Sequence, residues 1–154
     1  MAVIPQFSLN TNNPSEWGRV EAGAGTRDKR RVVVLTAQTT GAGATEIFID
    51  GVTNYRLKLF ENSIITVQIV GASLAPTAAG SAGFTGAATA SNIAGTVALV
   101  GAAVVTKVGN ATAALAVTAD DTNDALVFTV TPSAAVTTNW EIQLYITEVT
   151  DIQT

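Results

Sequence analysis

Residues 113–149 read AALAVTADDTNDALVFTVTPSAAVTTNWEIQLYITEV, and no other part of the chain indicates its fold class so clearly. Large apolar side chains alternate with small or polar ones over 115–118, 126–131 and 140–147, which is the period of a strand with one buried face. The cluster Asp120–Asp124, between the first two runs, is rich in turn-forming residues. The pattern predicts an antiparallel meander of three strands, whose apolar face needs a second sheet or another subunit to cover it.

The rest of the chain shows the same alternation in shorter runs, separated by turn signals such as Asp50–Gly51. No segment of ten residues has a helical period. Many short strands with closely spaced turns predict an all-β chain, folded as an antiparallel β-sandwich or jelly-roll-like domain. Trp140 and Phe128 lie on the apolar faces of their runs, so we expect them in the core rather than in a ligand platform. The further expected strands cover 31–39, 45–50, 55–60, 65–71, 96–100 and 103–108.

Two segments are expected to lie outside the regular strands. Residues 1–29 contain loop-forming sequence and few large apolar residues, which predicts an extended N-terminal arm attached to a β-sandwich domain at 30–154. Residues 71–95 consist mostly of Ala, Gly, Ser and Thr. We expect a long loop there, with at most an irregular strand around 82–90.

The C-terminal part of the chain, residues 95–149, carries a family resemblance. Its motifs are TVALVG at 96–101, VTK at 105–107, ALAVTAD at 114–120, TNDAL at 122–126, TVT at 129–131, Trp140, and TEV at 147–149. In order and spacing these motifs resemble a β-rich structural module of tailed-bacteriophage virion proteins, which occurs in tail-fibre proteins and in small capsid-associated proteins. The resemblance implies a virion component that is usually trimeric and has no catalytic activity.

This resemblance leads to one expected function and one alternative. The small size, the arm and the low charge favour a capsid decoration (cement) protein, a homotrimer that stabilises the head by binding between coat subunits. Its expected partners are copies of itself and the major capsid protein, and its expected location is the capsid surface of the virion. The alternative is a tail-fibre or tail-associated receptor-binding protein. An enzyme such as a depolymerase is disfavoured.

The composition excludes several kinds of chemistry. The chain of 154 residues contains no cysteine and no histidine, which rules out disulfide frameworks, Cys/His zinc sites and histidine-dependent nucleophilic triads. Charged residues are 13% of the chain, about half the usual share, which suits a protein packed in an assembly. We expect no enzyme activity, no cofactor, no small-molecule substrate, no signal peptide and no membrane-spanning segment.

Charge is also unevenly distributed along the chain. Residues 1–31 have a net charge of +2 and the remainder has −6. The acidic body makes direct nucleic-acid binding unlikely, whereas the basic start can attract an acidic neighbour. From Asn62 to Thr106 there is no charged side chain over 45 consecutive positions. Because charge is depleted at interface cores, we expect part of this segment at a subunit–subunit interface.

The candidate partner-binding residues lie near the N-terminus. Two isolated aromatics are expected to anchor the arm in a groove on a partner, since aromatics dominate interface energies. The only basic run is expected to contact an acidic face of a neighbouring coat subunit. A disordered terminus and a solvated strand entrance remain the alternatives, and DNA contact is weaker because nothing aromatic or basic extends the run. The candidates are Phe7, Trp17, Arg27, Lys29, Arg30 and Arg31.

Three other features have a structural explanation that competes with a functional one. The oxygen-rich cluster at 120–124 lacks the glycine and the distal glutamate of an EF-hand loop, so a hairpin turn with solvated acids is favoured over a cation site. Glu141 and Glu148 are seven residues apart and should face opposite sides of one strand, a poor glycosidase pair. Gly-x-Gly at 23–25 and 41–43 opens no expected helix, which disfavours a phosphate cradle.

Overall fold

The computed structural model describes residues 20–21, 28–109 and 112–150. All regular structure in these ranges is β apart from one 3-10 turn, η1 (Ala78–Gly80), which confirms the all-β prediction. Most of the expected arm lies outside the described residues, although β1 and the first residues of β2 pair with each other within it. The strands are β1 (Val20–Glu21), β2 (Asp28–Thr39), β3 (Thr45–Ile49), β4 (Leu57–Lys58), β5 (Ser63–Leu74), β6 (Ala82–Ile93), β7 (Thr96–Leu99), β8 (Val104–Gly109), β9 (Ala114–Asp120), β10 (Ala125–Thr131) and β11 (Thr138–Thr150).

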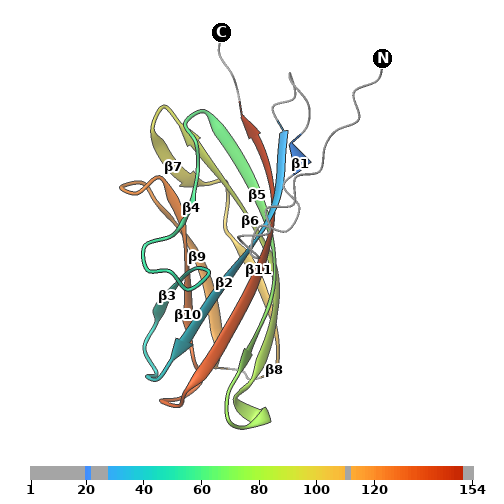
Figure 1. Cartoon of the computed structure of the whole chain (residues 1–154), viewed down its shortest axis with the longest axis vertical. Coiled ribbons are helices and arrows are strands. Elements are labelled where there is room, and N and C mark those ends of the chain that lie inside the picture. Colours follow the sequence, from blue (N-terminus) through green and yellow to red (C-terminus); the bar gives the residue numbers. More distant parts are fainter. Residues whose placement is uncertain (1–19, 22–27, 110–111, 151–154) are drawn as a thin grey trace.

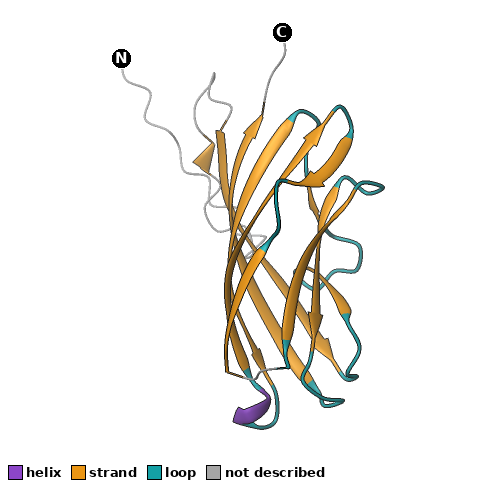
Figure 2. Ribbon diagram, turned by 180° about the vertical axis from the view of Figure 1, so that it is seen from behind, coloured by secondary structure: helices purple, strands orange, loops and turns teal. Residues whose placement is uncertain are grey.

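The strands form one curled antiparallel sheet (Figures 1 and 2). Its order is β4-β10-β3-β2-β11-β5-β6-β7, with β9 on β10, β8 on β6 and β1 on β2. Strand β3 connects the two halves, because Ile47 pairs with Phe128 of β10 while Ile49 pairs with Leu35 of β2. The sandwich or jelly-roll detail of the prediction is therefore not confirmed, since the halves are hydrogen-bonded into a single sheet.

The predicted meander of three strands is wrong in its third member. Strands β9 and β10 form the expected hairpin, but β11 pairs with β2 and β5 instead of β10. Strand β11 has 13 residues, and its neighbours β2 and β5 have 12 each, whereas β10 has only 7. Pairing with the long strands satisfies the backbone of β11 over its whole length, which β10 could not do.

The long loop predicted for 71–95 is also wrong over most of its length. Residues 71–74 continue β5, and β6 occupies Ala82–Ile93 as a 12-residue strand paired with β5 on one edge and with β7 and β8 on the other. Its buried residues include alanines, so the alternation between inside and outside is hidden in the sequence. Pairing on both edges outweighs the low strand propensity of Ala and Gly. The expected strand at 55–60 is reduced to Leu57–Lys58.

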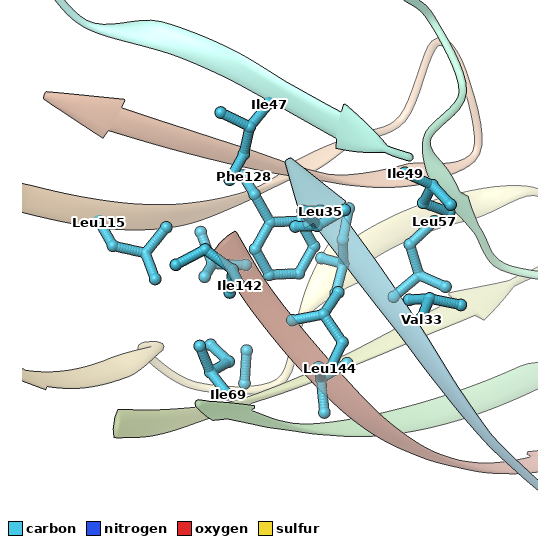
Figure 3. Close-up of a cluster of buried hydrophobic side chains, with 14 of the residues drawn as sticks. Val33, Leu35, Ile47, Ile49, Leu57, Ile69, Leu115, Phe128, Ile142 and Leu144 are labelled. Atoms are coloured by element: carbon cyan, nitrogen blue, oxygen red, sulfur yellow. The ribbon is translucent and has the colours of Figure 1, made fainter. Parts of the chain in front are cut away.

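The core lies inside the curl, where side chains from both halves of the sheet meet (Figure 3). Leu35 and Leu144 extend from the long strands towards Phe128 of β10, and each is at most 1% exposed. Trp140 is 3% exposed, stacks at a tilt on Phe84 with ring centroids 5.8 Å apart, and donates its indole N–H to Thr39 Oγ1 at 3.0 Å. The predicted core positions of Trp140 and Phe128 are confirmed.

Candidate interaction surface

The structure describes only part of the predicted partner-binding set. Phe7, Trp17 and Arg27 lie outside the described residues. Lys29, Arg30 and Arg31 lie in β2, where Arg30 is exposed and the next side chain, Arg31, is only 30% exposed. Because successive side chains of a strand point to opposite faces, these two arginines lie on opposite sides of the sheet and do not form one patch.

Arg31 instead faces a buried acid. Its Nη2 lies 3.9 Å from Oε2 of Glu148, whose side chain is 1% exposed. In the described part of the chain, both carboxylate oxygens of Glu148 and the Nε and Nη2 of Arg31 are buried without a hydrogen-bond partner. A buried pair with such incomplete hydrogen bonding is weak support for stability. Glu141 is exposed on the other face of β11, which confirms that the two glutamates point to opposite sides.

A regular surface is formed by the outward-pointing side of β11, β5, β6 and β8, which we call the outer face. Strand β5 alternates strictly between buried and exposed residues from Ser63 to Val70, and β11 does so over most of its length. Large apolar side chains on this side are 40–76% exposed. They are Ile64, Val70 and Leu74 of β5, Ile93 of β6, Val104 and Val108 of β8, and Tyr145 and Val149 of β11.

The outer face is nearly free of charge. Its cross-strand rows run, for example, Tyr145–Gln68–Ala87–Val104, with side chains that are short or uncharged. Lys107 of β8 belongs to the inner side, where its Nζ donates to the Ala113 carbonyl at 2.6 Å. The charge-free segment is visible in the sequence, but the exposed valines of β8 belong to the same surface only because β6 lies between β8 and β5.

This surface is close in size to one side of a protein–protein interface. Strands β5 and β6 pair over eleven positions, and four strand widths lie side by side at β11, β5, β6 and the β7/β8 edge. At about 3.3 Å per residue and about 4.8 Å per strand, this amounts to roughly 700 Å². A stable protein–protein interface buries about 800 Å² on each partner. The outer face therefore approaches the area that one such contact requires.

A second feature is a groove between the start of β2 and β4, which we call the β2–β4 groove. Its volume is about 210 Å³, and its lining includes Arg31 and Val33 from β2 and Leu57 from β4. Two large aromatics, Tyr55 and Phe60, are also part of the lining and are 43% and 56% exposed. Sequence reasoning missed the groove because its two sides are more than twenty residues apart in the chain.

The charges of the groove are largely paired. Arg56 makes a bidentate contact with Glu46, through Nε–Oε1 at 2.6 Å and Nη2–Oε2 at 2.9 Å. The hydrogen bond from Arg56 to Glu46 raises the pKa of the guanidinium. Its Cζ also lies 5.4 Å from the centroid of the Phe48 ring, a cation–π distance. The groove therefore offers mainly an apolar floor and an aromatic rim.

The acidic cluster at 120–124 forms the hairpin turn between β9 and β10, as predicted from the sequence. Asp120 accepts hydrogen bonds from the backbone N–H of Asn123 at 3.1 Å and from its side-chain amide at 2.7 Å. The side-chain bond from Asn123, more than any other cause, lowers the pKa of Asp120. Asp121 accepts from the Val97 N–H at 2.6 Å, and Asp124 accepts from the Asn92 amide at 3.4 Å. These carboxylates hold the β9–β10 turn against neighbouring strands.

The described residues contain no candidate metal centre. Among them, no three His, Cys, Asp or Glu side chains come close enough to share a metal ion. Gly41 and Gly43 lie in an exposed loop between β2 and β3, where no helix begins, and Gly23–Gly25 lies outside the described part. No helix within the described ranges is long and apolar enough to span a membrane. Comparison of the chain with models of known protein families and with curated proteins found no match.

Proposed function

We propose that this protein is a structural component of a tailed-bacteriophage virion, a trimeric capsid decoration protein that binds between coat subunits. The observation that carries the structural role is the outer face, which has exposed Ile, Val, Leu and Tyr side chains and, in its four strands, Glu141 as its one charged residue. Several large apolar side chains exposed on one face of a β-sheet are a mark of an interaction site. The assignment to a phage particle rests on the motif resemblance over 95–149.

The mechanism is mechanical. The outer face packs against a neighbouring copy, and the assembled protein adds buried area across the joints between coat subunits. Each contact need only be weak, because many linked contacts on one particle add through avidity. The basic N-terminal region supplies the electrostatic part, since residues 1–31 have a net charge of +2 and meet an acidic neighbour.

The test adds purified protein to capsids that lack it and then heats them while DNA release is recorded. Full-length protein should raise the temperature of release, and a form without residues 1–25 should protect less. A variant with Thr85→Lys and Ala87→Lys on the outer face should also fail to protect, because it places charges in an uncharged contact. The matched control is Thr118→Lys, an exposed position on β9 away from the outer face.

Equal protection by all forms would contradict the proposal. Gold labels on the protein in whole virions distinguish the two positions in the particle. Labels spread over the head support a decoration protein. Labels at the tail would overturn that proposal in favour of a tail-fibre or receptor-binding component.

A further inference from the structure

One edge of β2 is incomplete in the described chain. Along its other edge, β2 pairs with β11 from Asp28 to Thr39. On the incomplete edge, Lys29 and Arg30 pair with β1, and the Val34 carbonyl accepts the Asp50 N–H at 2.9 Å, where β3 takes over. Between these two contacts, residues 31–33 have no strand partner among the described residues.

In a strand, the backbone N–H and C=O groups of successive residues point to alternate edges, which identifies the groups that face this gap. The Val34 carbonyl points to the incomplete edge, so the N–H and C=O of Val32, two residues earlier, point there as well. Unpaired backbone groups at a sheet edge are a template for one more strand. The gap is three residues long and opens on the β2–β4 groove, which Arg31 and Val33 help to line.

The register of the β1–β2 pairing indicates which segment of the chain would continue along this edge. Glu21 pairs with Lys29 and Val20 with Arg30, so each step back in β1 is one step forward in β2. Continued in the same register, Arg19 falls opposite Arg31, Gly18 opposite Val32, and Trp17 opposite Val33. We propose that this chain's own residues 17–19 fill the gap as an extension of β1, with Trp17 seated in the β2–β4 groove.

The chemistry of the groove fits this occupant. Directly opposed residues of an antiparallel pair point to the same face, so Trp17 points the same way as Val33, a buried residue of the groove lining. The exposed rings of Tyr55 and Phe60 in the same lining provide aromatic partners for an indole. No other residue of the N-terminal segment before β1 combines this register with a side chain large enough to cover them.

The proposed register brings two arginines together, and the buried carboxylate of Glu148 offsets their repulsion. Arg19 falls opposite Arg31, and like charges in opposed positions destabilise a strand pair. Beside them, both carboxylate oxygens of Glu148 accept no hydrogen bond within the described residues. A second guanidinium near this buried acid supplies donors for those oxygens.

The consequence is a division of the arm into two parts. With Trp17 held on its own domain, residues 1–16 remain to reach a neighbour. At about 3.3–3.6 Å per residue, 16 residues span at most about 58 Å, which is well below the reach of the whole arm. Phe7 then becomes the arm's aromatic anchor for a partner, and Trp17 becomes part of the domain.

The first test uses introduced cysteines, because the chain has none of its own. In the proposed register Arg19 and Arg31 form a non-hydrogen-bonded pair, with Cα atoms about 4.5 Å apart, which suits a disulfide. Arg19→Cys with Arg31→Cys should form a disulfide within one chain under mild oxidation. The matched control, Arg19→Cys with Val32→Cys, places the thiols on opposite faces and should stay reduced. Equal cross-linking of both pairs, absence of cross-linking in both, or links only between chains would overturn the proposal.

The second test keeps both arginines, since losing Arg31 would leave Glu148 without its ion pair. Hydrogen exchange is followed at the Val32 amide of the full-length protein. Gly18→Pro removes the N–H that would donate to the Val32 carbonyl. The strand pair then loses one of the two bonds at this position, which should speed exchange of the Val32 amide by about tenfold or more. Thr11→Pro, outside the proposed strand, should leave it unchanged. Unaltered exchange in the Gly18→Pro variant would contradict the proposal.

Discussion

The two faces of β5 differ in why they are uncharged. On the inner face of β5, Ile65, Val67 and Ile69 are at most 1% exposed, because they form the core. On the outer face of the same strand, Ile64, Val70 and Leu74 are 40–65% exposed, yet this side carries no charge either. Folding accounts for the first face and not for the second. The proposed contact with another molecule would account for the absence of charge on this exposed side.

The largest expected effect lies on the inner face. Trp140→Ala should lower the free energy of unfolding by about 3–5 kcal/mol, because it removes a buried aromatic together with its contact on Phe84. Thermal or urea unfolding followed by circular dichroism measures this loss. Tyr145→Ala, on the outer face of the same strand, is the comparison and should cost far less in a monomer. Equal losses would show that the two faces do not differ as described.

A smaller effect is expected at Gly71, on the inner side of β5. A Cβ at this position would meet the side chain of Ile142 on β11 and would lie 2.7 Å from the Glu141 carbonyl oxygen. Gly71→Ala should therefore destabilise the protein by about 1–3 kcal/mol through overpacking. Gly83→Ala on the outer side of β6 is the control, since the nearest atom to its Cβ would be 4.0 Å away. A Gly71→Ala variant as stable as the Gly83→Ala control would contradict this packing.

On the outer face, charge should affect association far more than folding. Thr85→Lys with Ala87→Lys is expected to change the stability of the isolated chain by about 0.5 kcal/mol per site or less, because exposed positions tolerate substitution. The free energy of unfolding is measured with urea, at a protein concentration low enough that the chains do not associate. A loss of several kcal/mol there would mean that these positions serve the fold itself.

The smallest effect concerns the β9–β10 turn. The Asn123 side chain lowers the pKa of Asp120, so this contact stabilises the fold at pH values above the ordinary carboxyl pKa of about 3.9 and is lost as the pH falls through the lowered value. Asn123→Ala should therefore reduce stability at pH 7 and reduce it less at pH 2, where more of the Asp120 carboxyl is protonated. Urea unfolding at both pH values checks this, and an equal loss at both would show that the bond acts independently of the charge.

The difference between β10 and β6 explains how far the sequence predicts the fold. In β10, Leu126, Phe128 and Val130 alternate with smaller or polar residues, so the strand and its buried face could be read directly. In β6, buried Ala88 and Ala90 alternate with Thr and Ser, and no local contrast in size marks the inside. Its strand structure comes from pairing on both edges, which is a tertiary property.

The position of β11 and the β2–β4 groove could not be predicted from the sequence, because both depend on tertiary contacts. Alternation along 140–147 predicted a strand and its faces correctly, but not its neighbours, which depend on matching lengths far away in the chain. The groove joins Arg31 to Leu57 and Phe60, whose proximity no local pattern indicates. The charge-free segment could be recognised from the sequence, whereas its arrangement as one face required the strand order.

The most direct test of the outer face is the mass of the protein in solution. Sedimentation equilibrium at micromolar concentration should give about three times the 15.7 kDa chain mass for the unaltered protein. The same measurement on the Thr85→Lys, Ala87→Lys variant should give a single chain, and the Thr118→Lys control should remain a trimer. A stable monomer for the unaltered protein, or a trimer that survives both lysines, would contradict the claim that the outer face joins the subunits.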